Sequence, residues 1–325
     1  MAQSGIRMQK IWRKRGVIRM AQKKNFSVLS SDGVHNLSGV VYLPEGEIKG
    51  LFHVVHGMTE HIARYDRFLS DIADQGYISF GYNHLGHKDT ANDSELGYIA
   101  KENGWQLLVN DVKVYSDAVR AEFGNSEMPL CLMGHSMGSF VVRLAAEKCV
   151  SPDRLIVMGT GGPNPAAGVG LALIGVTKRI KGDKHISKLI DDIAFGSYNN
   201  RFGGASSEDP SKWLTCDESV RKAYYADKYC TFKFTVSAMG DLIRLIKHSN
   251  RADWFKNISA DLPILLVSGD DDPVGDYGKG VRAVESKLKK QGKRVECKIY
   301  KGARHEILND FTYQATLEDI LEFCN

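Results

Sequence analysis

The sequence lacks several patterns that would each mark a particular class of protein. Its 325 residues contain no apolar run close to the roughly 18 that a membrane-spanning helix needs. They contain no phosphate-binding loop, no complete glycine-rich dinucleotide fingerprint and no motif that reads RNA or DNA. A membrane-spanning protein, a nucleotide-dependent enzyme and a nucleic-acid-binding protein are therefore poor interpretations of this chain.

Paired cysteine motifs are also missing. The six cysteines are scattered along the chain without C-x-x-C spacing, and several stand in apolar segments. Buried free thiols in a reducing compartment explain this distribution best, and we therefore expect a cytoplasmic protein.

Acidic residues are absent from the first 24 positions, which carry eight Lys and Arg. The net charge of the whole chain is +4, so the remainder, with 35 basic and 39 acidic residues, has a net charge of −4. A mildly acidic body gives no reason to expect a nucleic-acid partner. The basic arm, residues 1–24, also lacks the apolar centre of about 7–15 residues found in a secretory signal.

Two interpretations of this basic arm remain open. Its bulky apolar residues would form a loose helical face, which suits contact with an anionic membrane surface. Alternatively, the arm has no function of its own and Met20 is a second start position.

From Asn25 onward, short strands alternate with helices. Strands are expected at 26–30, 37–43, 50–55, 77–82, 130–133, 154–158, 263–268 and 294–300. Helices are expected at 64–75, 106–123, 140–148, 280–291 and 314–324. Alternation of this kind predicts an α/β fold, in which a mostly parallel sheet is flanked by helices on both faces.

The alternation stops between residues 163 and 255. This stretch has helix-like segments at 170–178, 187–195 and 235–247 but no run typical of a buried strand. We therefore expect a core formed by 25–162 and 256–325, with 163–255 inserted as a helical cap, or lid. An apolar segment within it, 166–176, fits an acyl channel or lipid contact, and equally fits a core helix of the cap.

The stretch 129–139 carries a G-x-S-x-G pentapeptide, from Gly134 through Ser136 to Gly138. It stands between a buried strand and a helix, a context in which the central serine is strained and points outward. The glycines let strand and helix approach closely. Ser136 is thus a candidate nucleophile, although a serine that only caps the helix is the plainer alternative.

An activated serine needs a base and an orienting acid, and both follow in the chain. The strand 263–268 leads into Asp270, Asp271, Asp272 and Asp276, and the strand 294–300 leads into His305. Each group follows a sheet strand, where α/β folds place their sites. Asp272 precedes a proline and is biased to an extended conformation, but the other three remain open as turn or helix-cap acids.

An oxyanion needs about two N–H donors. Met137, directly after the serine, and Met58, in the loop after the strand 50–55, are the natural positions. The histidines and glutamate of residues 56–61 miss metalloprotease spacing. We therefore expect no metal and no cofactor.

Five separated motifs carry a family resemblance. They are H-G-M-T-E-H-I-A-R-Y (56–65), N-H-L-G-H (83–87), G-H-S-M-G-S (134–139), S-G-D-D-D-P-V-G-D (268–276) and A-R-H-E-I-L-N (303–309). Together they resemble the monoacylglycerol lipase and lysophospholipase group of α/β-hydrolases, often labelled serine aminopeptidase-like. The chain departs from that pattern at Asn83, where the family loop often has an acid, and at Lys88, where it often has glycine.

The resemblance implies an α/β-hydrolase fold with a Ser136–Asp272–His305 triad, an oxyanion hole at Met58 and Met137, and a helical cap. In that family the acid is the aspartate before the proline, which favours Asp272. The implied activity is hydrolysis of acyl esters such as monoacylglycerols or lysophospholipids, with a small-molecule substrate and contact with a lipid surface.

Two other functions remain open. An aminopeptidase of the same fold would need acids in the cap to hold a free amine, and Asp191, Asp192, Glu208 and Asp209 are available. A binding module without catalysis would be expected to lack one member of the triad, and all three are present.

Overall fold

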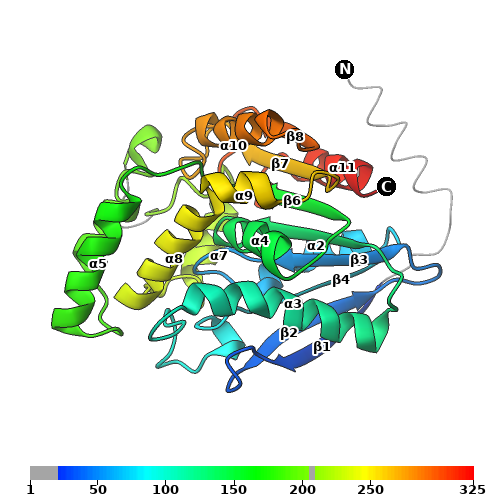
Figure 1. Ribbon diagram of the computed structural model, residues 1–325, viewed down its shortest axis with the longest axis horizontal. Coiled ribbons are helices and arrows are strands. Elements are labelled where there is room, and N and C mark those ends of the chain that lie inside the picture. Colours follow the sequence, from blue (N-terminus) through cyan, green and yellow to red (C-terminus); the bar gives the residue numbers. More distant parts are fainter. Residues whose placement is uncertain (1–20, 205–208) are drawn as a thin grey trace.

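One sheet of eight strands organises the protein (Figure 1). The computed structural model describes residues 21–204 and 209–325, so both interpretations of the basic arm fall largely outside the described residues. The strands are β1 (Gln22–Leu29), β2 (Asn36–Leu43), β3 (Gly50–Val55), β4 (Tyr77–Tyr82), β5 (Leu130–His135), β6 (Arg154–Met158), β7 (Ile264–Gly269) and β8 (Val295–Tyr300). Their order in the sheet is β1-β2-β4-β3-β5-β6-β7-β8.

The sheet is mostly parallel, as the sequence predicts. Only β2 runs against its neighbours, pairing antiparallel with both β1 and β4, and every other pair is parallel. The carboxyl ends of β3 and β5 to β8 therefore lie at one edge of the sheet, where the loops that follow them meet.

The first strand begins earlier than the sequence suggests. Lys23 and Lys24, interpreted as the end of the basic arm, belong to β1 and pair with Tyr42 and Val41 of β2. An edge strand tolerates lysines because its side chains largely remain in solvent. Lys23 also contacts the Asp66 carboxylate at 2.5 Å.

Helices cover both faces of the sheet. α3 (Gly104–Phe123), α4 (Met137–Lys148) and α10 (Lys279–Lys290) pack on one face, and α2 (Asp66–Ala73) and α11 (Tyr313–Cys324) pack on the other. Short 3-10 turns lie at Ile62–Tyr65 (η1), Lys88–Thr90 (η2), Asn200–Phe202 (η3) and Ile307–Asn309 (η4).

Burial on both faces explains why the central strands are apolar throughout. In β5, Leu130 and Leu132 belong to the hydrophobic cluster of one face, and Cys131 and Met133 to that of the other. The strand therefore shows no polar alternation, as is usual for a parallel strand between two helical layers.

The chain between β6 and β7 forms a helical layer, the lid. Its helices are α5 (Ala167–Lys181), α6 (Lys188–Phe195), α7 (Glu218–Ala226), α8 (Val236–Ser249) and α9 (Ala252–Asn257). α8 packs against α3 and α4 and carries α5 on its outer side, at the edge of the molecule in Figure 1. Among the described helices, none has both the length and the hydropathy required to cross a bilayer.

Candidate active site

Ser136 stands at the turn from β5 into α4, with backbone angles (φ 53°, ψ −119°) that side-chain-bearing residues rarely adopt. The Ser136 N–H donates to the Met158 carbonyl of β6 at 3.0 Å, and the Ser139 hydroxyl donates to the Ser136 carbonyl at 2.6 Å. Strain of this kind persists only where the surroundings enforce it. Here it directs Ser136 to the wall of a large cavity.

The two glycines of the pentapeptide allow this turn. A Cβ on Gly134 would overlap the Gly138 carbonyl oxygen, and a Cβ on Gly138 would overlap the Val55 carbonyl oxygen. Strands β3 and β5 and helix α4 therefore meet at a spacing that only glycine permits.

His305 lies in the loop after β8 and lines the same cavity as Ser136. Its Nδ1 contacts Asp272 Oδ2 at 2.9 Å, in the loop after β7, and both residues are buried. The Val274 N–H donates to Asp272 Oδ1 at 2.9 Å. The carboxylate is thus held at the Nδ1 edge of the imidazole, which leaves Nε2 as the ring nitrogen available for chemistry.

The neighbouring aspartates have other partners. Asp270 accepts a hydrogen bond from the Gly302 N–H at 2.6 Å, and Asp271 faces Arg201 at 3.7 Å. Asp276 has a left-handed backbone (φ 48°) and stands at the cavity wall. Of these acids, Asp272 is the one that hydrogen-bonds His305.

The loop after β3 lies against the nucleophile. A Cβ on Gly57 would come within 3.0 Å of the Ser136 Cβ, so only a glycine lets the loop approach this closely. Met58, the next residue, and Met137, the first residue of α4, both line the cavity. The Met137 amide belongs to the free N–H groups of a helix N-terminus, which favour negative charge.

The cavity has a volume of about 1130 Å³ and lies between the sheet edge and the lid. Ser136 and His305 form part of its floor, while lid residues such as Phe195, Trp213 and Ile246 contribute apolar surface. Trp213 packs over His305 with ring centres 5.0 Å apart. The lid therefore covers the histidine directly.

The model of the family described as "Serine aminopeptidase, S33" matches residues 46–312, most of the chain. The chain belongs to this family. The similarity expected from the five sequence motifs is confirmed, since the relatives found by comparison include monoglyceride lipases.

Relatives and solved structures agree with this membership. A monoacylglycerol lipase of Mycolicibacterium smegmatis is 23% identical over 90% of this chain and 97% of its own length. A mouse monoglyceride lipase is 23% identical over 81% of this chain and 77% of its own length. The crystal structure of a carboxyl esterase from Bacillus coagulans in complex with glycerol is 26% identical, with a TM-score of 0.85 over 93% of this chain and 98% of that one. The α/β-hydrolase fold is confirmed.

A buried network of charged groups lies beneath the turn of Ser136, and it was not predicted from the sequence. Glu60 accepts hydrogen bonds from the Gly57 N–H at 2.6 Å and the Tyr65 hydroxyl at 2.9 Å, and lies 3.2 Å from His135 Nδ1. Its other oxygen accepts from Arg64 at 3.0 Å. One carboxylate thus connects the loop of Met58 to the residue before Ser136.

Burial alone would lower the pKa of His135, but its hydrogen bond to Glu60 and the Glu60 charge outweigh it and raise that pKa above 6.5. Burial alone would raise the pKa of Glu60, but His135 and Arg64 hold it well below its ordinary value. Each group thus favours the charged form of the other. His135 Nε2 donates to the His305 carbonyl at 3.2 Å, which extends the network to the loop of His305.

The network also reaches the residue after His305. Arg64 makes a bidentate ion pair with Glu306, with N–O distances of 2.6 and 2.7 Å. Such fork-to-fork contacts fix orientation as well as charge. The segments that carry Met58, Ser136 and His305 are thus joined by charged groups shielded from solvent.

The other histidines of this region, His56, His84 and His87, hydrogen-bond to one another or to the backbone. His56 accepts from the His84 N–H at 3.1 Å, and His87 lies 3.0 Å from the Leu85 carbonyl. Burial lowers the pKa of His56 and of His87 to about 3, so both rings are neutral. His61 instead turns toward the lid and contacts Asp227 at 2.9 Å.

Replacing Glu60 with Gln should lower both stability and activity. Removing one partner of a buried ion pair typically lowers the free energy of unfolding by about 3 kcal/mol. Displacement of the loop of Met58 should lower kcat by about 100-fold. Urea unfolding and ester hydrolysis measure the two effects, and Glu285→Gln, which loses an exposed helix-surface pair with Lys289, is the matched control.

The pH dependence tests the charge assignment. The folded pKa of His135 is raised, so its stabilisation is complete below the ordinary histidine range and is lost as pH rises through the folded pKa. The folded pKa of Glu60 is lowered, so its contribution is lost only as pH falls through that low value. In Glu60→Gln, the free energy of unfolding should therefore no longer fall as pH rises through the folded pKa of His135. If this alkaline fall persists unchanged, His135 is not the charged partner.

Proposed function

We propose that this chain hydrolyses carboxylic esters of single acyl chains, of the monoacylglycerol or lysophospholipid type, through an acyl-enzyme on Ser136. Hydrolysis of carboxylic esters on this fold is the activity that the family, the lipase relatives and the esterase structure support together. The observation that carries the mechanism is a strained Ser136 sharing one cavity with a His305 whose Nδ1 is held by buried Asp272.

In the proposed reaction, Ser136 Oγ attacks the ester carbonyl and His305 Nε2 takes its proton. Asp272 accepts from Nδ1–H and stabilises the imidazolium that forms. The amides of Met58 and Met137 donate to the oxyanion. His305 then protonates the leaving alcohol, and a water molecule repeats the sequence to release the acid and free Ser136.

The cavity supports an acyl ester with a small polar head group. Ligand pockets usually measure roughly 300–1,000 Å³, so a volume of about 1130 Å³ leaves room for a chain as well as a head group. Its wall combines apolar side chains, among them Phe140, Leu242 and Val274, with polar ones such as Asn199.

The lid acids give an aminopeptidase little support. Asp191 lies 2.7 Å from Lys233, Asp192 pairs with Lys188, and Asp209 lies 2.9 Å from Arg221. Each is therefore already neutralised by a base. Glu208 lies outside the described residues.

The outer surface of the lid supports contact with a lipid surface. Many of the large apolar side chains that remain exposed in the described part of the chain gather there: Val169, Val176, Ile180, Ile186, Leu189 and Ile193. Lys178, Arg179 and Lys181 stand in the last turn of α5 beside them. Exposed apolar residues flanked by bases suit an anionic interface.

A cytoplasmic location is proposed from the thiols. All six cysteines are free, and three of them, Cys131, Cys230 and Cys324, are buried. Unpaired buried thiols are typical of reducing compartments.

Ser136→Ala should abolish hydrolysis of p-nitrophenyl esters, lowering kcat by at least about 10⁴-fold. An ester series from acetate to palmitate, measured beside aminoacyl p-nitroanilides, separates the esterase from the aminopeptidase. Turnover that survives the substitution would remove Ser136 from the mechanism. Turnover of the aminoacyl substrates alone would replace the ester assignment.

Asp272→Asn should lower kcat by roughly 10³–10⁴-fold, because an amide cannot hold the imidazolium or its tautomer. Asp270→Asn is the matched control, since an asparagine can still accept from the Gly302 N–H. Equal losses in both variants would contradict the assignment of the acid.

Val176→Asp and Ile180→Asp should each weaken binding to vesicles of anionic phospholipid by about tenfold, because each removes an exposed apolar side chain that the lipid would bury. Sedimentation with vesicles measures this binding. Val34→Asp, which changes an exposed valine in the turn between β1 and β2, outside helices α5 and α6, is expected to bind like the unmodified protein. Unaltered binding in the two lid variants would move the contact elsewhere.

A further inference from the structure

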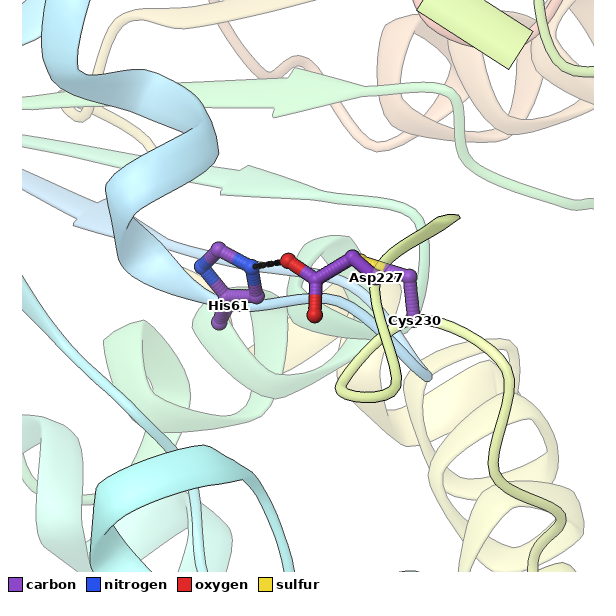
Figure 2. A group of neighbouring side chains, drawn as sticks. All are labelled: His61, Asp227 and Cys230. Carbon is purple, nitrogen blue, oxygen red and sulfur yellow. Dashed lines mark hydrogen bonds and ion pairs between the residues drawn. The ribbon is translucent and has the colours of Figure 1, made fainter. Parts of the chain in front are cut away.

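Three side chains with metal-binding atoms meet where the lid touches the core (Figure 2). His61 comes from the loop before η1, while Asp227 and Cys230 come from the lid just after α7. His61 and Cys230 are 5% and 3% exposed, and Asp227 is partly buried. The His61, Asp227 and Cys230 donor atoms all lie within 4.8 Å of one another.

The local backbone holds two of these groups side by side. The Cys230 N–H donates to the Asp227 carbonyl at 3.0 Å, which closes a turn over residues 227–230. The Tyr229 N–H donates to Asp227 Oδ1 at 2.8 Å, so that Oδ2 is left to face His61 at 2.9 Å. Cys230 is a buried free cysteine, so its thiol is not held in a disulfide.

We propose that His61, Asp227 and Cys230 bind a zinc ion that ties the lid to the core. Imidazole, carboxylate and thiolate are the ligands zinc prefers, and three protein ligands leave a fourth position for water. In a tetrahedral site with ligand distances of about 2.0–2.3 Å, donor atoms stand roughly 3.3–3.8 Å apart. Donor atoms as far apart as 4.8 Å must therefore approach by roughly 1–1.5 Å, while His61 Nε2 and Asp227 Oδ2, now 2.9 Å apart, must separate by about 0.5 Å.

Proton balance follows from the ligand set. On binding, the Cys230 thiol loses its proton to solvent, and the sulfur donates an electron pair to the ion. His61 must offer Nε2 as a lone pair, so its one ring proton moves to Nδ1, and Lys88, which can only donate, must give up its contact with that nitrogen. The carboxylate of Asp227 exchanges its hydrogen bond with His61 for a bond to zinc. One proton is released for each ion bound.

The charges around the cluster set its affinity. Lys88 Nζ lies 3.4 Å from His61 Nδ1 and opposes a second cation. Arg64 also lies in this region, but its charge is neutralised by Glu60 and Glu306. Cys230 lines the active-site cavity, which offers the ion a route from solvent. Lys88 is therefore the group whose removal should strengthen binding.

The test is zinc binding by the full-length protein after its metal has been stripped with a chelator. Equilibrium dialysis against micromolar Zn²⁺ should give one ion per chain, with one proton released. Cys230→Ala and Asp227→Asn should each weaken binding at least tenfold, and Lys88→Ala should strengthen it severalfold. Cys216→Ala removes an exposed thiol outside the cluster and should leave binding unchanged.

Cobalt supplies a second readout. Co²⁺ bound in place of zinc should show the near-ultraviolet absorption of a cobalt–thiolate bond in the wild type and not in Cys230→Ala. Failure of the wild type to bind zinc, equal binding by Cys230→Ala and Asp227→Asn, or absence of the thiolate band would each overturn the site.

The outcome is independent of the proposed ester hydrolysis. None of the three ligands takes part in the proposed reaction, so the metal-free protein is expected to hydrolyse esters. If the ion restrains the lid, zinc should slow turnover of long-chain esters in the wild type and not in Cys230→Ala.

Discussion

The carboxylate of Glu60, buried beneath the nucleophile, is the constraint on which the geometry of the site depends. A buried charge is tolerated only when it is paired and its oxygens accept hydrogen bonds. Its partners come from three segments: the loop after β3, η1 and the end of β5. Moving any one of them would leave an unpaired charge out of water. The position of the Met58 loop relative to Ser136 is therefore set by electrostatics as well as by packing.

Much of the fold can be predicted from the sequence because both faces of its parallel sheet are buried. Strands such as β3 and β7 have no exposed residue, so they appear as continuous apolar runs with clear ends. The pentapeptide around Ser136 is recognisable for a similar reason, since its glycines are required by close backbone contacts. Order along the chain then indicates His305. In these places the requirement for an apolar side chain or a glycine comes from the local environment of each residue, so it is visible in a short stretch of sequence.

Other features depend on contacts between distant segments, and local pattern cannot reveal them. Asp270, Asp271 and Asp272 are alike in sequence, and only the packing of two loops brings one of them to His305. The ionic pairing of Glu60 with His135 joins residues from two separate motifs. In helix α7 the one buried residue is Arg221, a charged side chain, and the helix was not predicted. The first residues of β1 were also not predicted, because lysines at a sheet edge do not form an apolar pattern.

The loop 56–61 contacts the turn of Ser136 on one side and the lid on the other. Glu60 turns inward to the pair with His135, while His61 turns outward to Asp227 of the lid. Between Met58 and Glu60, the Thr59 carbonyl accepts a hydrogen bond from the Tyr224 hydroxyl of α7 at 2.9 Å. The Tyr224 ring in turn packs against the Arg64 guanidinium, 4.9 Å from its centre. The segment that carries a proposed oxyanion donor is thus bonded to the lid on one side and to the nucleophile turn on the other. Both attachments are short, and the inner one is buried, so the loop of Met58 is held between α7 and the turn of Ser136.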